Sequence, residues 1–390
     1  MILCPIRGLV KEKVKRFTEF VRNGRAARSC VRDFDAASRS PLRASKRKGG
    51  IVATMKDVAR LADVSIATVS FTVNNTKPVS PATRARVEAA MLELGFRRNA
   101  VGRALASKRT HILALLYPAL QHRFRGTVVD FFTSAASMAN ELGYNLVLWP
   151  AGNDAELDEL TSTGLVDGVL LMEVQVEDPR VDQLQKSGTP FALIGRTADP
   201  SALDYVDIDF EGTVAAAIDH FVALGHTSIG LLDGGVGSGA LRGYGPVVRT
   251  RAAFESVTAE RGLTAFLTSC DENPSAGRAA AAGLLEDAPG MTALIVMNEH
   301  AAPGLVNGLS RLGVTVPDDL SILLIASSKE MAAMSDPELT VMSAPSMELG
   351  RRGVELLIDQ LEGKHDHDRQ ALVMCAFEPG QSTAPPTPLV

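Results

Sequence analysis

The clearest candidates for a chemical role are small, hydroxyl-bearing side chains that recur over a short stretch near the front of the chain. Ser65 can cap the free amides of a new helix, which we expect over Ile66–Val73. Small side chains on a helix allow close approach to base edges in a DNA groove. The exposed side of this helix would carry Ala67, Thr68, Ser70 and Phe71.

A short helix is expected on each side of this one. Before it, apolar residues recur at helical spacing at Val58, Ala59 and Ala62. Asp63 then lies in the turn between the two helices, a position that suits Asp because it tolerates left-handed backbone better than most residues. After it, Ser80–Pro81 supplies a cap and a proline at the first helical position, and Gly95 ends the third helix. The pattern predicts a compact helix-turn-helix head over residues 55–98.

The net charge of −5 conceals a basic front and an acidic remainder. Residues 1–54 carry 14 Lys and Arg against 4 Asp and Glu, and residues 55–110 carry 10 against 4. The rest holds 16 against 37, a net charge of −21. A basic front is typical of a segment that contacts a polyanion. For residues 1–54, a flexible basic extension without a specific partner is an equal alternative, and a start of translation near Val52 or Met55 is also open.

Composition excludes several classes of protein. A length of 390 residues, with 46% hydrophobic and 22% charged residues, suits two or three domains with ordinary cores. No apolar run reaches the roughly 18 residues that span a bilayer, and the first residues do not resemble a secretory signal. The four cysteines are scattered, which argues against a disulfide scaffold or zinc site and fits a reducing cytoplasm. We therefore expect no membrane contact, bound metal or cofactor.

Motifs for catalysis are equally weak. Gly234–Gly239 follows a strand but lacks the spacing of a dinucleotide or Walker loop. His365–Asp368 lies in a polar loop and is interpreted as a solvated charge run. We find no convergent nucleophile, base and orienting residue, so an enzyme is not expected.

From residue 111 the chain alternates short apolar runs with helical segments, the pattern of a doubly wound parallel sheet. About 270 residues exceed one such sheet, so we predict two α/β lobes with a cleft between them. Expected helices are Val128–Leu142, Thr213–Leu224, Thr250–Arg261 and Pro303–Leu312. Expected strands are Ile112–Leu116, Asn145–Leu148, Gly168–Leu171, Phe191–Ile194, Ile229–Leu232, Ala293–Val296 and Ser321–Ile325. The tail from Ser382 is expected to be irregular.

These motifs resemble the lactose-repressor/galactose-repressor (LacI/GalR) family of bacterial transcription regulators, over roughly residues 55–385. The head phrase is the most specific, and it comprises Lys56–Ala62 and Val64–Ser70, followed by Asn74–Asn75. Weaker phrases follow in the order of the family, among them Val166–Val169, Ala223–Ile229, Val316–Ile322 and Ser382–Pro386. The resemblance implies a helix-turn-helix head and a two-lobed body like that of periplasmic binding proteins.

The resemblance also implies a homodimer whose two heads bind the halves of a near-palindromic operator in double-stranded DNA. Residues 99–106 would become helical only on the operator, where Leu105 would enter the minor groove and kink the duplex; alternatively, Leu105 packs on the body. Phe71 replaces a common arginine, which would exchange a guanine contact for an apolar one, unless it belongs to the core of the head. The DNA-binding candidates are Ser65, Ile66, Ala67, Thr68, Ser70, Phe71, Asn74, Asn99, Arg103, Leu105 and Ala106.

In the body, the resemblance implies an effector site in the cleft. Arg251 and Asn298 match family positions, and Glu299 stands where an aspartate is usual. Ala326 replaces an aspartate that often grips effector hydroxyls, which puts an ordinary sugar pose in doubt. For Arg251, a solvated or interlobe ion pair is the alternative. The effector-binding candidates are therefore Arg251, Asn298, Glu299 and Ala326.

Taken together, these features predict a cytoplasmic, nucleoid-associated repressor controlled by a small molecule, possible ligands including sugars and other metabolites. A solute-binding protein without DNA function is the alternative. The predicted domains are a basic extension (1–54), the head (55–98), a hinge helix and linker (99–110) and the body (111–385). Within the body, we assign residues 111–208 and 340–368 to the first lobe, and 209–339 and 369–385 to the second.

Overall fold

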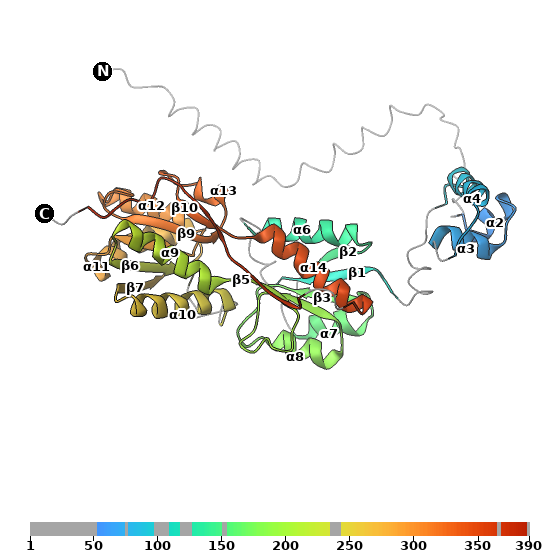
Figure 1. Ribbon diagram of the computed structural model, residues 1–390, viewed down its shortest axis with the longest axis horizontal. Coiled ribbons are helices and arrows are strands. Elements are labelled where there is room, and N and C mark those ends of the chain that lie inside the picture. The colour runs from blue at the N-terminus through green and yellow to red at the C-terminus, as the bar shows by residue number, and fades with distance from the viewer. Residues whose placement is uncertain are drawn as a thin grey trace, which may run out of the picture. The chain divides into compact units, whose positions relative to one another are not determined.

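The computed structural model describes residues 53–74, 77–96, 109–117, 127–149, 154–234, 243–364 and 368–387. The chain divides into two compact units, residues 1–98 and 99–390, each of which is described by itself (Figure 1). The predicted hinge helix, with Asn99, Arg103, Leu105 and Ala106, lies outside the described residues, as does residues 1–52 of the basic extension. Within the described part of the chain, no helix combines the length and hydrophobicity needed to cross a bilayer.

The head consists of three helices, as predicted. They are α2 (Met55–Leu61), α3 (Ile66–Asn74) and α4 (Pro81–Glu93). Their shared core is small and aliphatic, and its buried members are Val58, Ala59, Ala62, Val69, Val73, Val87 and Ala90. Asp63 has a φ of 49° in the turn between α2 and α3, and Gly95 has a φ of 59° after α4. Both turn predictions are therefore confirmed, since these are left-handed conformations.

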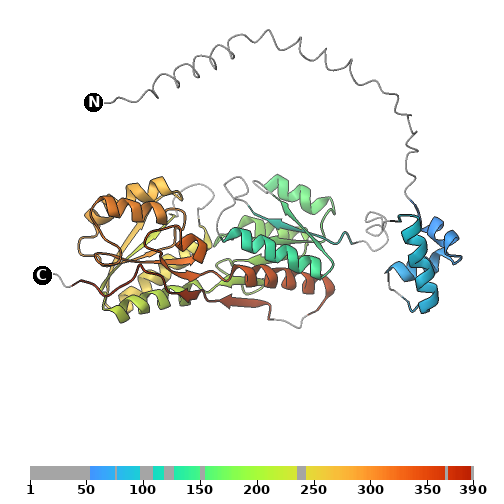
Figure 2. The same ribbon diagram turned by 90° about the horizontal axis from the view of Figure 1, so that it is seen from above.

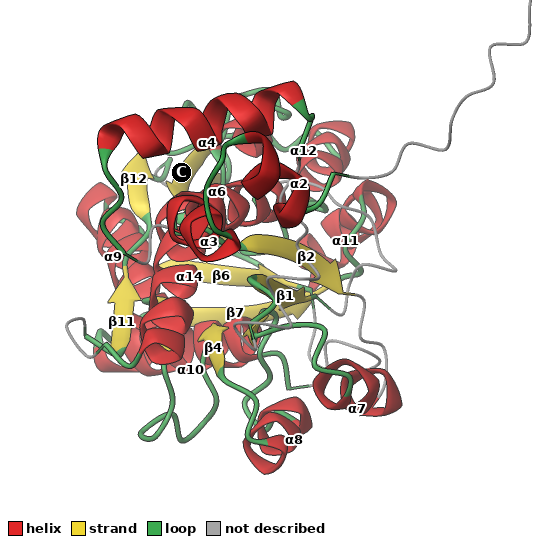
Figure 3. Cartoon of the chain, turned by 90° about the vertical axis from the view of Figure 1, so that its right-hand side faces the viewer, coloured by secondary structure: helices red, strands yellow, loops and turns green. Residues whose placement is uncertain are grey.

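The first lobe is built on a parallel sheet of six strands in the spatial order β11-β5-β4-β3-β1-β2. Its strands are β1 (Ile112–Leu116), β2 (Asn145–Trp149), β3 (Gly168–Leu171), β4 (Phe191–Ile194), β5 (Tyr205–Ile208) and β11 (Gln370–Val373). Two helices, α6 (Val128–Glu141) and α14 (Ser346–Glu362), cover one face, and α7 (Asp154–Ser162) and α8 (Pro179–Ser187) cover the other (Figure 3).

Alternation along β1, which lies inside the sheet between β3 and β2, explains the two layers of helices. Leu113 and Leu115 point to the side of α6 and α14, whereas Ala114 and Leu116 point to the side of α7 and α8. All four side chains are fully buried. A strand that is buried on both faces has an unbroken run of apolar residues in the sequence. The bounds of β1 were predicted accurately for this reason.

The second lobe repeats this plan, with the spatial order β12-β10-β9-β8-β6-β7. Its strands are β6 (Ser228–Asp233), β7 (Thr264–Ser269), β8 (Ala293–Val296), β9 (Ser321–Ser327), β10 (Thr340–Ser343) and β12 (Ala376–Glu378), of which β12 is antiparallel to β10. Its helices are α9 (Phe210–Leu224) and α10 (Gly245–Glu260) on one face, α11 (Pro274–Asp287) and α12 (Ala302–Arg311) on the other, and the short α13 (Lys329–Ala332).

The chain passes between the lobes three times, after β5, after β10 and after β11. The strand β10 pairs in the second sheet and β11 in the first, so the second and third crossovers lie at residues 344–345 and 374–375. These positions are a few residues later than the predicted lobe boundaries at 340 and 369, because the crossovers follow the ends of strands rather than their beginnings. Figure 2 shows α14 returning beside α6 after the second crossover.

The C-terminal tail is irregular, as predicted, but it is firmly attached to the second lobe. The Ser382 hydroxyl donates to the Ile322 carbonyl at 2.5 Å and accepts from the Thr340 amide at 2.8 Å. The His226 ring contacts the Ala384 carbonyl through Nε2 at 2.9 Å. Polar contacts of this kind allow a segment without regular structure to lie against a sheet.

Candidate DNA-binding helix and interlobe cavity

The N-terminus of α3 is capped and open to solvent in the head. Ser65 Oγ accepts a hydrogen bond from the Thr68 amide at 3.0 Å and also contacts Thr68 Oγ1 at 2.8 Å. Ser65, Ile66 and Ala67 are exposed, and Ile66 retains 46% of its accessible surface. An aliphatic side chain this exposed at a capped helix start is not explained by the core of the head. It is placed where a recognition helix presents side chains to bases.

Phe71 lies outside the buried core of the head, which answers one alternative left open by the sequence. Its ring is half-buried, and the Lys77 ammonium nitrogen lies 5.0 Å from the ring centroid. Val69 and Val73, on the other side of α3, supply the core contacts. Thr68 and Ser70 are also half-buried, and the side chain of Asn74 is outside the described residues.

The first helix has a cap that was not predicted from the sequence. Thr54 and Asp57 form a capping box, in which the Asp57 amide donates to Thr54 Oγ1 at 3.4 Å and the Thr54 amide donates to Asp57 Oδ2 at 3.0 Å. The signal was present as a threonine followed three residues later by an acidic residue. This box fixes the beginning of α2.

In the body, a cavity of about 210 Å³ lies between the two lobes, and we call it the interlobe cavity. The first lobe contributes residues that directly follow its strands, such as Tyr117, Met172 and Gly195. The second lobe contributes Gly234 after β6 and Met297 after β8. The carboxyl ends of both sheets therefore meet at one site, which is where open α/β sheets bind ligands.

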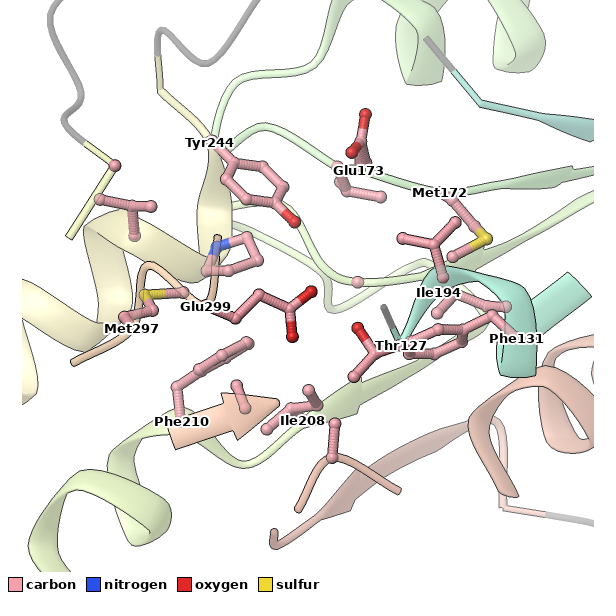
Figure 4. A pocket seen from close by; sticks show the side chains of 18 of the residues that line it. Thr127, Phe131, Met172, Glu173, Ile194, Ile208, Phe210, Tyr244, Met297 and Glu299 are labelled. Carbon is pink, nitrogen blue, oxygen red and sulfur yellow. The ribbon is translucent and has the colours of Figure 1, made fainter. Parts of the chain in front are cut away.

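One carboxylate connects the two lobes inside this cavity. Glu299 Oε2 accepts a hydrogen bond from Ser327 Oγ at 2.5 Å within the second lobe, and the Thr127 backbone amide in the first lobe also donates to Glu299. Burial raises the pKa of Glu299, and these two hydrogen bonds oppose the increase. Figure 4 shows the Glu299 carboxylate facing Thr127 across the cavity. Thr127 is the N-cap of α6, so the carboxylate also lies at the positive end of a helix dipole.

Further features mark the lining on both lobes. Burial raises the pKa of the Tyr117 phenol, and the adjacent Glu173 carboxylate, which accepts a hydrogen bond from it, raises it further. Burial likewise raises the pKa of Tyr244. Glu173 and Ala326 both have a φ of 52° and both line the cavity. Left-handed backbone at residues other than glycine is strained, and such strain concentrates at functional sites.

Asp207 lies at the same edge of the cavity within a group of balanced charges. Burial raises its pKa to about 6, against the opposing effects of Arg249 and Arg196. Arg196 Nε is 3.3 Å from Asp207 Oδ2, and Arg196 Nη2 also binds Glu211 at 2.7 Å. Arg249, on α10 of the second lobe, and Arg196, in the first lobe, therefore offset the Asp207 charge.

Three of the four predicted effector residues come together, and the fourth does not join them. Asn298, Glu299 and Ala326 line the interlobe cavity. Asn298 Nδ2 donates to the Cys270 carbonyl at 3.0 Å, and its Oδ1 accepts from the Ala301 amide at 3.1 Å, so this side chain also fixes the loop after β8. Arg251 is not among the residues that line the cavity; its effector role remains a prediction.

Arg251 is held by a bidentate ion pair within the second lobe. Its Nε and Nη2 atoms bind the two oxygens of Asp233 at 2.5 and 2.8 Å, and Nη2 also donates to Ser269 Oγ at 2.7 Å. Asp233 is fully buried. The alternative of an ion pair is thus realised, but within one lobe rather than between the two.

The two remaining sequence motifs, the glycine-rich loop and the histidine-containing run, are not assigned to a site. The Gly234–Gly239 loop is described only at Gly234, and His365, Asp366 and His367 lie outside the described residues. Among the described residues, no group of three or more His, Cys, Asp or Glu side chains could hold a metal ion.

Comparison with known proteins gives two family matches. Residues 54–99 match the bacterial regulatory proteins of the lacI family, and residues 218–383 match the periplasmic binding protein-like domain. Catabolite control protein A from Priestia megaterium is 30% identical over 311 residues, which cover 78% of this chain and 91% of that protein. The repressor CytR from Escherichia coli K12 is 28% identical over 337 residues, or 84% of this chain and 96% of CytR.

Solved structures agree with these matches. The lac repressor dimer bound to operator and the anti-inducer ONPF has a TM-score of 0.72 at 22% identity, covering 85% of this chain and 99% of that one. The complex of the transcriptional regulator CelR with cellobiose has a TM-score of 0.63 at 25% identity, with the same coverage. The chain has the helix-turn-helix head and two-lobed body of these proteins, and it aligns with nearly the whole length of its relatives. It therefore belongs to the LacI family of ligand-regulated, DNA-binding transcriptional regulators.

Proposed function

We propose that the protein acts as a homodimeric repressor in the cytoplasm, with one head on each half of a near-palindromic operator. A small molecule in the interlobe cavity would set the affinity for the operator. The observation that carries this proposal is the combination of a capped, solvent-facing α3 with a separate unit that holds a cavity between two lobes. A solute-binding protein would need the cavity but not the head.

Within the head, we assign base contacts to Ile66, Ala67 and Phe71. Thr68 and Ser70 carry hydroxyls that suit phosphate contacts, which position the protein without reading sequence. Ser65 would act by capping α3 and so fixing its start. Asn74, at the end of α3, would contact the DNA backbone. An aromatic ring at position 71 favours an apolar contact, such as one to a thymine methyl group.

For residues 99–106, we propose a helix that forms on the operator, with Leu105 wedged between base pairs. A helix of this length needs contacts outside itself to offset its ordering entropy. Asn99 would cap it, Arg103 would approach phosphate, and Ala106 would allow close packing in the minor groove. Two such helices, one from each subunit, would require the bodies to hold them at a fixed separation.

The coupling step follows from the geometry of Glu299. Its carboxylate bonds to Ser327 in one lobe and to the Thr127 amide in the other, so a ligand that contacts it acts on both lobes. A ligand shifts the arrangement of the lobes only to the extent that it binds one arrangement more tightly. Asn298 and Ala326 would contact the ligand beside Glu299, and Arg251 would do so if the ligand reaches the Asp233 side.

The test is a mobility-shift assay of the purified protein against genomic fragments. We expect binding confined to a near-palindromic site, with an affinity that falls on the order of a thousandfold between 50 and 200 mM salt. Size-exclusion chromatography with light scattering should give a dimer. A monomer that binds no duplex at low salt but does bind a metabolite would support the solute-binding alternative and reject the repressor.

A further inference from the structure

We propose that the ligand of the interlobe cavity carries a positively charged amine, and that Glu173 and Glu272 face that charge. This inference rests on the proposed function, because it names the class of ligand for the same cavity. It concerns charge and shape rather than the identity of one metabolite. A protonated amino sugar, a diamine or an aromatic amine all meet the description.

The first argument is the charge of the lining. Three glutamates line the cavity, Glu173, Glu272 and Glu299, whereas no Lys or Arg side chain lines it among the described residues. His300 is the basic group beside them, and its Nε2 lies 3.9 Å from Glu299. Asp207 is not counted, because Arg196 and Arg249 offset its charge. A neutral polyol would close the cavity over this excess of negative charge, whereas an ammonium group would neutralise part of it.

The second argument is the presence of aromatic rings among the acids. Tyr117, Phe131, Phe210 and Tyr244 all line the cavity. Phe131 and Phe210 are at least nine-tenths buried. In Figure 4 the rings of Phe131, Phe210 and Tyr244 surround the position of the Glu299 carboxylate. Aromatic faces attract cations through their quadrupole, and a site that combines carboxylates with rings is typical of ammonium recognition.

Glu299 has a different task from the other two glutamates. It accepts hydrogen bonds from Ser327 in its own lobe and from the Thr127 amide in the other lobe, which hold it between the two, whereas Glu173 accepts a hydrogen bond from Tyr117 within the lining. Glu272 lies at the solvent-reached edge of the cavity beside Gly234, and Glu173 lies opposite on the first lobe. An ammonium group between Glu173 and Glu272 would touch one carboxylate from each lobe. The charge would thus help to hold the lobes together.

The experiment uses three pairs of compounds that differ in an amine against a hydroxyl. They are glucosamine and glucose, 1,4-diaminobutane and 1,4-butanediol, and phenethylamine and 2-phenylethanol. Gluconate is added as an anionic compound for comparison. Binding to the full chain is measured by calorimetry at pH 7. We expect at least one amine to bind, and to bind about tenfold or more tightly than its hydroxyl partner.

Variants then separate charge from shape. Glu272→Gln and Glu173→Gln should each weaken the amine about tenfold and change the binding of its neutral partner less than twofold. The matched control is Glu286→Gln, an exposed glutamate of α11 away from the cavity, which should change neither. The proposal is overturned if no amine binds, if a neutral or anionic compound binds more tightly, or if the two cavity variants leave amine binding unchanged.

The proposed function is tested separately by operator binding of the ligand-free protein. If that protein binds a palindromic duplex while no amine binds, the ligand class is wrong and the repressor stands. If it binds no duplex either alone or with the amine, while the amine binds the cavity, the ligand class stands and the repressor is wrong. Neither result can be mistaken for the other.

Discussion

The Glu299 carboxylate, on the second lobe, accepts a hydrogen bond from the backbone amide of Thr127, the N-cap residue of α6 on the first lobe. Ser327 Oγ holds the same carboxylate at 2.5 Å from within the second lobe. A side chain that bonds to both lobes depends on their separation, because any opening of the cavity lengthens one of these bonds. Glu299 is therefore the residue through which occupancy of the cavity and arrangement of the lobes should be linked.

We predict that Glu299→Gln weakens this link without unfolding the protein. The amide is isosteric but uncharged, so the bonds to Ser327 and Thr127 lose their charge-assisted strength. Coupling between two sites is typically about 1–3 kcal/mol, and removal of its main contact should reduce the ligand effect on operator affinity by about tenfold. Operator dissociation constants measured with and without ligand give this ratio directly. An unchanged ratio would show that the lobes communicate through other residues.

Arg251→Ala distinguishes a structural role from an effector role. Because Asp233 is fully buried and bidentate with Arg251, loss of the guanidinium leaves a buried carboxylate without its cation. We expect a loss of about 3–5 kcal/mol in the free energy of unfolding, measured in urea. The double variant Arg251→Met with Asp233→Leu should recover most of it. A single variant that keeps its stability and loses only ligand binding would instead support the effector role.

The sequence predicted some strands with the bounds that the structure has and missed others. Gly168–Leu171 and Ala293–Val296 were expected with the bounds that the structure has, since each is buried on both faces. The edge strand β7 was missed because its exposure alternates and breaks the apolar run. The strand β5 was missed because Asp207 interrupts it; only the tertiary structure supplies Arg196 and Arg249, which make a buried Asp tolerable.

The same limit applies to the site. Asn298, Glu299 and Ala326 were predicted from the resemblance to the family, and all three lie at or just after the carboxyl ends of β8 and β9, where they line the interlobe cavity. Glu173 and Tyr244 lie in loops whose approach depends on how the two lobes face each other, which a single sequence does not reveal. The sequence could not show that Arg251 lies outside the cavity lining. Its ion pair with Asp233 joins two residues that are 18 positions apart in the chain, and only the fold brings them together.

The raised pKa of Asp207 predicts how stability depends on pH. The folded pKa is about 6 against the ordinary value of 3.8, so between these pH values the folded protein binds more protons than the unfolded chain. Stability from this group therefore increases as pH falls from about 6 to about 3.8, and its full contribution is retained below pH 3.8. Relative to Asp207→Asn, the native protein should gain about 2 kcal/mol between pH 7 and 4. Urea unfolding of both proteins across this range gives the difference; a flat difference would contradict the buried carboxyl.

Leu105→Ala tests the proposed hinge helix. A leucine wedged between base pairs contributes only on an operator that bends, so its loss should weaken specific binding about tenfold or more and leave non-specific binding nearly unchanged. The matched control is Leu92→Ala, because Leu92 is 86% exposed on α4 and has no assigned DNA contact. Fluorescence anisotropy with operator and scrambled duplexes measures both affinities. Equal losses on the two duplexes would mean that Leu105 packs on the body instead.

Phe71→Arg should change which base pair the head prefers rather than how tightly it binds DNA overall. Phe71 lies outside the head core, so the larger polar side chain replaces no buried contact except the ring that Lys77 covers at 5.0 Å. An arginine can bind guanine O6 and N7 bidentately, a contact worth about 1–3 kcal/mol of discrimination. Selection from a library of randomised operators should then shift one position in each half-site toward guanine. Val69→Arg, at a fully buried position on the same helix, is the contrasting variant and should unfold the head. An unaltered preference in the Phe71 variant would mean that this position contacts no base, which would restrict direct readout to Ile66 and Ala67.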